Sequence, residues 1–328
     1  LIDPVAYDLS ATTVVFPNKR ARLYLSKYLG ELTEKPVWAP QYLTITELME
    51  KISGYLFADR LYLLFETYGI FSDISGTSES FDSFYPYIDT LLADFDEIDK
   101  FLVNADDLFQ NLTDLKSLDG RFNYLTEEQI AVIRKFWDTF NPDSKSKGQE
   151  AFLTLWDAIP KVYHQLRNTL HQKQMAYEGM AYRRVVELLE EKDIPQVFNG
   201  RKFVFIGFNA LNACEERLFR YLKNLGCAEF FWDYDTWYTN SEIHEAGYFM
   251  RNNIRNFPQT KETGNENLIH NDYAHVFIVP VASNSGQAGI LPEIFNRFGI
   301  NDQHDVENTA VVLAYEGLLI PTLYAIPD

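Results

Sequence analysis

A strand–helix–strand pattern in the last third of the chain constrains the fold more than any other feature of the sequence. Residues 202–208 (KFVFIGF) and 228–233 (AEFFWD) are short apolar runs of the kind that form buried strands. Between them lies a helical pattern that ends at Gly226. Because strands joined by one helix pair in parallel through a right-handed crossover, this unit predicts a parallel sheet.

The start of the chain predicts a further strand of the same sheet. Residues 12–16 (TTVVF) are β-branched or apolar and are bounded by Pro17. Residues 33–43 contain two prolines and are predicted to be a linker. Between these segments, residues 18–32 have a helical pattern, and its apolar side is predicted to consist of Leu23, Leu25, Tyr28, Leu29 and Leu32.

A long helical stretch follows the linker. From Thr44 onward, apolar residues recur with the helical period for about 150 residues. Capping boxes are predicted at Thr44 with Glu47 and at Thr126 with Gln129. The helices are predicted over 59–72, 80–103, 126–140, 149–176 and 178–192.

Strands and helices alternate again towards the end of the chain. Strands are predicted over 275–281 and 309–314, and helices over 243–256, 285–298 and 317–324. The fold class is therefore α/β: a parallel-sheet domain with a large all-helical insertion, followed by the start of a second α/β domain that is expected to continue beyond Asp328. The predicted parts are 1–43 and 200–240 for the first sheet domain, 44–199 for the insertion and 241–328 for the second domain.

The charge of the chain limits what it can bind. It has 47 acidic and 29 basic residues, and its formal net charge is −18. A broad basic face is therefore not expected, although a local basic strip remains compatible with this charge. The two cysteines, Cys214 and Cys227, form neither a disulfide framework nor a metal motif, and they are expected to be reduced and buried, as in a cytoplasmic protein. No apolar run reaches the ~18 residues that a membrane span needs.

Five short segments follow one another along nearly the whole chain. They are Val14–Arg22 (VVFPNKRAR), Ala176–Gly179 with Tyr182-Arg183, Phe205–Phe208 with Cys214-Glu215-Glu216, Ser285–Ala288, and Ala310–Leu313 with Leu318–Pro321. As an ordered set they resemble the AddB-like subunits of AddAB/RecBCD-type helicase–nucleases. The resemblance implies a P-loop-helicase-like sheet domain of superfamily 1 that has lost its activity, an AddA-type helicase–nuclease partner, a role in DNA double-strand-break repair, and a PD-(D/E)xK nuclease domain beyond residue 328.

The residues needed for ATP hydrolysis are missing from the sequence. A P-loop requires a Gly-Lys dipeptide, which does not occur here. A Walker B strand ends in an acid that holds Mg²⁺, but residues 207–209 read Gly-Phe-Asn. Asp233 and Asp235 follow the next strand and are better explained as solvated strand-end residues. We therefore expect no ATPase site.

Other chemistries have no better support. Pro142-Asp143 with Lys145 resembles the nuclease signature but falls in a polar loop between predicted helices. Glycoside hydrolysis needs two carboxylates across a cleft, and the strand ends supply few acids. Two histidine pairs lack the spacing of a zinc site: His164 with His171, and His270 with His275. No catalytic residue, cofactor or metal is expected between residues 1 and 328.

Single-stranded DNA is the remaining candidate ligand. Proteins bind it with cations that contact phosphate and aromatic rings that stack on bases, and open α/β sheets bind ligands at the carboxyl ends of strands. The residues predicted at such ends are Asn18, Lys19, Arg20, Arg22, Phe208, Asn209 and, in the second domain, Gln287. Arg183 and Arg184 are weaker candidates. The alternative is a protein–protein interaction scaffold, in which the insertion docks a motor partner and the chain contacts no DNA.

Overall fold

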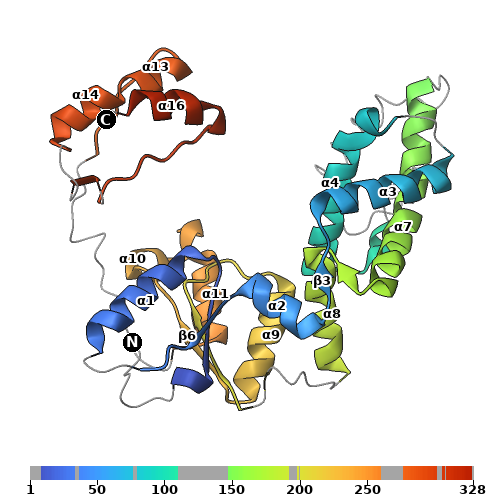
Figure 1. Cartoon of the computed structure of the whole chain (residues 1–328), viewed down its shortest axis with the longest axis horizontal. Coiled ribbons are helices and arrows are strands. Elements are labelled where there is room, and N and C mark those ends of the chain that lie inside the picture. The colour runs from blue at the N-terminus through green and yellow to red at the C-terminus, as the bar shows by residue number, and fades with distance from the viewer. Residues whose placement is uncertain are drawn as a thin grey trace. The chain divides into compact units, whose positions relative to one another are not determined.

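The computed structural model divides the chain into two compact units, Leu1–Ile269 and His270–Asp328 (Figure 1). No helix that it describes combines the length and the hydrophobicity needed to cross a membrane. The predicted helix 126–140 with its capping box, Asp143 with Lys145, and His270 with His275 lie outside the described residues. The described residues are 9–33, 37–76, 80–109, 147–191, 198, 200–259, 276–300, 305–306 and 308–326, and for 147–157 only the backbone is described.

Four parallel strands form the sheet of the first unit, in the order β2-β1-β5-β6. They are β1 (Thr12–Phe16), β2 (Gln41–Thr44), β5 (Lys202–Ile206) and β6 (Ala228–Phe231). The predicted α/β class and the common parallel sheet are confirmed. The predicted linker is wrong at its end, because β2 begins at Gln41; this strand is short and only half-buried at its start, so it lacks an apolar run.

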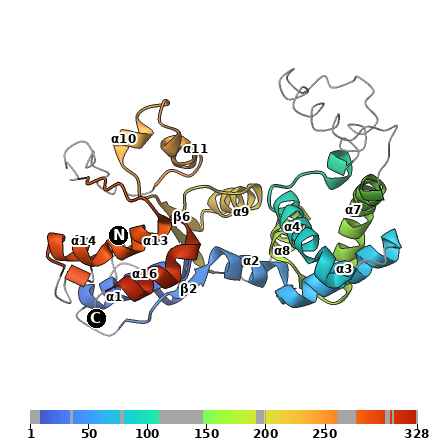
Figure 2. The same ribbon diagram turned by 90° about the horizontal axis from the view of Figure 1, so that it is seen from above.

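Helices cover both faces of this sheet (Figure 2). Helix α1 (Arg20–Leu32) packs on one face through Ala21 and Leu25. The other face is covered by α2 (Ile45–Ser53), α8 (Glu178–Glu190), α9 (Ala213–Asn224) and α11 (Tyr248–Asn256), which share one apolar core with the sheet. The chain moves outward from β1 to β2 and, in the opposite direction, from β5 to β6. Right-handed crossovers therefore place α1 and α9 on opposite faces, and the direction of winding changes between β1 and β5.

The insertion between β2 and β5 is largely helical. It contains α3 (Arg60–Ser75), α4 (Phe81–Lys100) and α7 (Lys147–Gln172), which share a second apolar core with the start of α8. Two short segments, β3 (Leu56–Phe57) and β4 (Met175–Ala176), pair in parallel where the chain enters and leaves this block. The predicted capping box at α2 is confirmed: Glu47 N donates to Thr44 Oγ1 at 3.1 Å, and Thr44 N donates to Glu47 Oε2 at 2.9 Å.

A fully buried carboxylate, Asp99, joins three helices of the insertion. Tyr163 Oη donates to Asp99 Oδ1 at 2.6 Å, and Tyr177 Oη donates to Oδ2. Arg167 Nη1 and Arg183 Nε lie 3.1 and 2.6 Å from Asp99 Oδ1. Burial and the neighbouring Asp99 carboxylate raise the pKa of Tyr163 to about 12, so its hydroxyl remains a donor at neutral pH.

The two weaker candidates for DNA contact, Arg183 and Arg184, are engaged within the fold. Arg183 faces Asp99 and donates to the carbonyl oxygens of Ile98 and Val103 at 2.9 and 2.7 Å, so its guanidinium holds the end of α4. Arg184 bonds to the carboxylates of Glu187 and Glu191. Both arginines therefore serve contacts within the fold and present no open cation to phosphate.

The segment after β6 belongs to the first unit. Two short helices, α10 (Thr236–Thr239) and η3 (Glu245–Gly247), lead from β6 to α11. The sequence placed residues 241–256 in the second domain, but α11 packs on the first sheet. Trp232 Nε1 donates to Phe257 O at 2.7 Å, and Phe257 is fully buried in the core that α9 shares with the sheet.

The second unit differs from its prediction. It contains α13 (Asn284–Gly289), α14 (Leu291–Phe298), η4 (Glu316–Leu318) and α16 (Leu319–Ala325). The predicted helix 285–298 is interrupted at Ile290, because Pro292 starts a new helix. The predicted strands 275–281 and 309–314 are wrong for the residues that are described: segments 276–281 and 309–313 have no strand partner among them, and Ile278 and Val312 are 90% and 88% exposed.

Candidate nucleic-acid interface

The turn between β1 and α1 carries the predicted cations. Strand β1 is completely buried, so the chain emerges at the carboxyl edge of the sheet after Phe16. Asn18 Oδ1 accepts a hydrogen bond from Arg20 N at 3.0 Å and thereby satisfies one backbone donor at the start of α1. The first turn of this helix has no acid, and Arg20 and Arg22 are both exposed. This cationic start is unfavourable for the helix dipole and would be stabilised by a bound anion.

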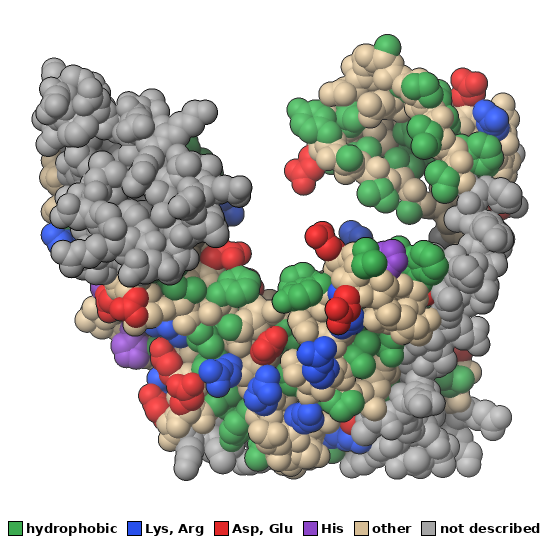
Figure 3. Space-filling view, turned by 180° about the vertical axis from the view of Figure 1, so that it is seen from behind, with side chains coloured by type: hydrophobic (Ala, Val, Ile, Leu, Met, Phe, Trp, Pro, Cys, Tyr) green, Lys and Arg blue, Asp and Glu red, His purple; other side chains and the backbone are tan. Residues whose placement is uncertain are grey.

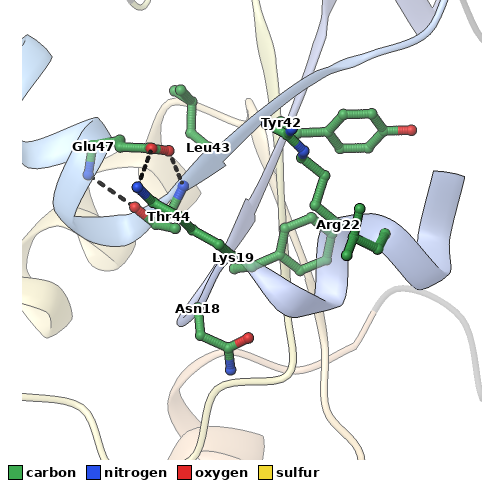
Figure 4. Close-up of a pocket in the computed structure, with 9 residues that line it drawn as sticks. Asn18, Lys19, Arg22, Tyr42, Leu43, Thr44 and Glu47 are labelled. Atoms are coloured by element: carbon green, nitrogen blue, oxygen red, sulfur yellow. Dashed lines mark hydrogen bonds and ion pairs between the residues drawn. The ribbon is translucent and has the colours of Figure 1, made fainter.

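The neighbouring strand provides the opposite wall of a pocket (Figure 4). Strand β2 lies beside β1, and its last residue, Thr44, caps α2. Lys19 reaches towards Glu47, and its Nζ lies 3.6 Å from Glu47 Oε1. The Lys19 side chain is nevertheless 84% exposed, so this ion pair is weak and leaves the ammonium available to phosphate.

The pocket between these two strand ends has a volume of about 340 Å³. Two aromatic side chains line it, Phe16 and Tyr42, whose rings stack with their centres 6.4 Å apart. Its polar lining consists of Asn18, Lys19, Arg22, Thr44 and Glu47. The structure thus brings three of the seven predicted site residues to one pocket, at the sheet edge where the sequence placed them.

Helix α1 presents aromatic rings beside its cations. Only Ala21, Leu25 and Leu29 face inward, at four-residue spacing. Leu23, Tyr28 and Leu32, which the sequence assigned to the apolar side, are 66%, 56% and 67% exposed, so that part of the prediction is wrong. Arg20, Tyr24, Lys27 and Tyr28 lie along one outward side of the helix. We call the exposed residues Lys19, Arg20, Arg22, Tyr24, Lys27 and Tyr28 the α1 surface.

The remaining candidates are distributed differently. Phe208 is not available to a ligand: it is buried, and its ring packs against Phe205 and Phe219 at 6.1 and 5.3 Å. Asn209 is exposed at the neighbouring strand end, where its carbonyl oxygen accepts a hydrogen bond from Asn253 Nδ2 at 2.5 Å. Gln287 is exposed on α13 in the second unit.

Asp235, His164 and His171, which the sequence singled out, have local partners. Asp235 caps α10 by accepting from Trp237 N at 2.7 Å, while Asp233 is exposed. His164 Nε2 lies 2.7 Å from Asp106 Oδ1, and His171 Nδ1 lies 2.5 Å from Tyr55 Oη. Within the described ranges, no three His, Cys, Asp or Glu side chains are grouped so that they could hold a metal ion.

One carboxyl with a strongly raised pKa, Glu215, lies at the start of α9, on the face of the sheet opposite α1. Glu215, on α9, is 8% exposed and completes a capping box in which it accepts from Asn212 N at 3.0 Å. Burial raises the pKa of Glu215 to about 7, an effect that the Asn212 hydrogen bond and the charge of Lys100 only partly offset. This carboxyl has a structural role as a helix cap.

Replacement of Glu215 by Gln is expected to stabilise the protein in a pH-dependent manner. The folded state binds the Glu215 proton more tightly than the unfolded chain, so wild-type stability decreases as pH rises from the ordinary pKa of 4.5 towards 7. A Gln keeps the cap and removes the buried charge. The free energy of unfolding of the Glu215→Gln variant should equal that of the wild type at about pH 4.5 and should exceed it by about 3 kcal/mol at about pH 8. Urea unfolding at several pH values measures this difference. Glu216→Gln removes the same charge on the same helical turn, and an equal gain there would contradict the explanation.

Comparisons of the chain with protein-family models and with curated proteins find no match.

Proposed function

We propose that the chain is the non-catalytic, helicase-like module of an AddB-type DNA-repair subunit, and that it holds single-stranded DNA on the α1 surface. The observation that carries this proposal is the alternation of exposed cations and exposed aromatic rings along α1, a helix that starts at the carboxyl edge of a parallel sheet. Cations contact phosphates and rings stack on bases, which is the combination used for single-strand binding. The pocket lined by Asn18, Lys19 and Arg22 adjoins this surface.

We further propose that the helical insertion docks an AddA-type motor subunit. Leu61 and Phe65 on α3 and Tyr85 and Tyr87 on α4 are 63%, 57%, 41% and 58% exposed. Exposed aromatic side chains of this kind are enriched in protein–protein interfaces. The same observation favours the alternative function, a scaffold that binds a protein partner and no DNA.

Salt-dependent binding separates the two functions. A fluorescent oligothymidine of about 15 nucleotides should bind at low salt with weak affinity, because the chain has a net charge of −18. The double variant Arg20→Gln/Arg22→Gln should reduce affinity about tenfold. It should also make the negative slope of log K against log salt shallower by about 1.4, which is about 0.7 for each lost phosphate contact. Fluorescence anisotropy measures both quantities.

Two further variants complete this experiment. Tyr24→Ala/Tyr28→Ala should reduce affinity about thirtyfold or more while keeping the salt slope, because it removes two stacking rings and no charge. Lys161→Gln, on the exposed side of α7, is the matched control and should leave binding unchanged. No binding by the wild type at low salt would favour the scaffold.

A further inference from the structure

A second basic surface lies on the face of the sheet opposite α1. Helices α9 and the end of α11 are in contact there: Lys223 Nζ donates to Asn256 O at 2.6 Å, and the Arg220 guanidinium lies 5.9 Å from the centre of the Phe257 ring. The space-filling view of this side of the first unit shows a group of Lys and Arg side chains (Figure 3). We call Arg217, Arg220, Lys223 and Arg255, all exposed, the α9–α11 surface.

The charge of this surface is opposite to that of the whole chain. Helix α11 carries Arg251 and Arg255 and no acid. Of the two acids on α9, Glu215 is buried and Glu216 is half-buried. Among the described residues, no carboxylate forms an ion pair with any of the four cations of the surface. In a chain of net charge −18, these unneutralised cations make a local site for a polyanion.

The surroundings of these cations suit phosphate contact without base stacking. Phe219 on α9 and Phe257, whose ring lies below the Arg220 guanidinium, are completely buried, and the half-buried Tyr221 packs against Phe198 with ring centres 6.0 Å apart. The exposed rings of α11, Tyr248 and Phe249, begin the helix and lie about 10 Å along its axis from Arg255. The polar neighbours include the amides Asn224 and Asn256, which are residues of the type that contacts the DNA backbone. A surface with cations and no adjacent stacking ring fits duplex DNA, whose bases are already stacked.

We propose that the α9–α11 surface binds the phosphate backbone of double-stranded DNA. The inference rests on the proposed function only in taking DNA as the ligand, because the residues and the face of the sheet are different. The two surfaces then divide one substrate: a duplex lies against α9 and α11, and a single strand lies against α1. A DNA end that carries both forms could contact the two faces of the same sheet.

The test compares two double variants on two labelled probes, a hairpin duplex of about 20 base pairs and the oligothymidine. Arg217→Gln/Arg255→Gln should weaken duplex binding about tenfold at about 50 mM salt. It should also make the negative slope of log K against log salt shallower by about 1.8, which is about 0.9 for each lost phosphate contact. The same variant should bind oligothymidine with an affinity within about twofold of the wild-type value. Arg20→Gln/Arg22→Gln should show the reverse, and Lys161→Gln should change neither.

The outcomes distinguish this inference from the proposed function. Duplex binding that is absent at low salt, unaffected by Arg217→Gln/Arg255→Gln, or equally reduced by Lys161→Gln would overturn the inference, whatever the single-strand result. Displacement of the duplex by polyglutamate as effectively as by unlabelled duplex would overturn it in favour of an acidic protein ligand. If the wild type does not bind oligothymidine but Arg217→Gln/Arg255→Gln still weakens duplex binding, the inference stands and the proposed single-strand site is wrong.

Discussion

Replacement of Asp99 by Asn is expected to lower the free energy of unfolding of the first unit by about 3–5 kcal/mol. Asp99 is fully buried; it accepts hydrogen bonds from Tyr163, Arg167 and Tyr177 and forms an ion pair with Arg183. An Asn has almost the same shape, so packing is kept and the charge alone is removed. Two guanidiniums that are only 24% and 17% exposed then lose their shared counter-charge. The amide nitrogen also faces donors that it cannot satisfy.

Urea unfolding followed by far-UV circular dichroism measures this loss as a shift of the midpoint. The control is Asp89→Asn, which removes a carboxylate from an ion pair with Arg60 whose side chains are 39% and 70% exposed. A surface pair of this kind is worth about 0.2–1 kcal/mol. Glu187 lies 3.6 Å from Arg167 and provides partial compensation in the Asp99 variant. Equal costs for the two substitutions would show that Asp99 is not the acceptor on which these helices depend.

The Asp99 cluster also shows what the sequence could not predict. The acceptor Asp99 is separated along the chain from its donors Tyr163, Arg167 and Tyr177 by 64, 68 and 78 residues. A carboxylate on a helix is usually a solvated residue, and no spacing marks this one as buried. By contrast, the strands β1, β5 and β6 were predictable, because a parallel strand covered on both faces is an uninterrupted apolar run. Strand β2 (QYLT) has no such apolar run, and the sequence therefore did not predict it.

Local backbone geometry explains why one candidate site residue was misplaced. The sequence put Phe208 at the open end of β5, in the position that corresponds to Asn18 after β1. Gly207 has a φ of +79°, which a residue with a side chain adopts only with strain. This turn directs Phe208 back onto the core, and Asn209 is left at the edge. A Gly after a strand could have indicated a reversal, but its direction depends on helices that pack later.

The α1 surface was predicted only in part, for a similar reason. Its cations follow β1 directly, so the strand rule located them. Its rings were assigned to the core because Leu23, Tyr28 and Leu32 fit a broad apolar stripe. The sheet accepts only the narrow row Ala21, Leu25 and Leu29. The four-residue spacing of small and aliphatic side chains in that row was the available signal.

Replacement of Phe219 by Ala is expected to lower the free energy of unfolding by about 4 kcal/mol. Phe219 is completely buried on α9, and its ring centre lies 4.1, 5.3, 5.4 and 5.8 Å from those of Phe205, Phe208, Phe230 and Phe257. This one ring therefore joins α9 to the neighbouring strands β5 and β6 and to the segment after α11. Its removal leaves a cavity that four rigid rings cannot collapse to fill, so the transfer and cavity costs add.

The measurement is urea unfolding followed by tryptophan fluorescence, to which Trp232 contributes; its ring stacks on Phe230 with centres 6.0 Å apart. Phe249→Ala makes the same chemical change at a side chain that is 46% exposed on α11, and it should cost less than about 1 kcal/mol. Phe219→Leu should fall between the two, because a Leu fills part of the cavity. If Phe219→Ala costs no more than Phe249→Ala, α9 is not fixed to the sheet by this ring cluster.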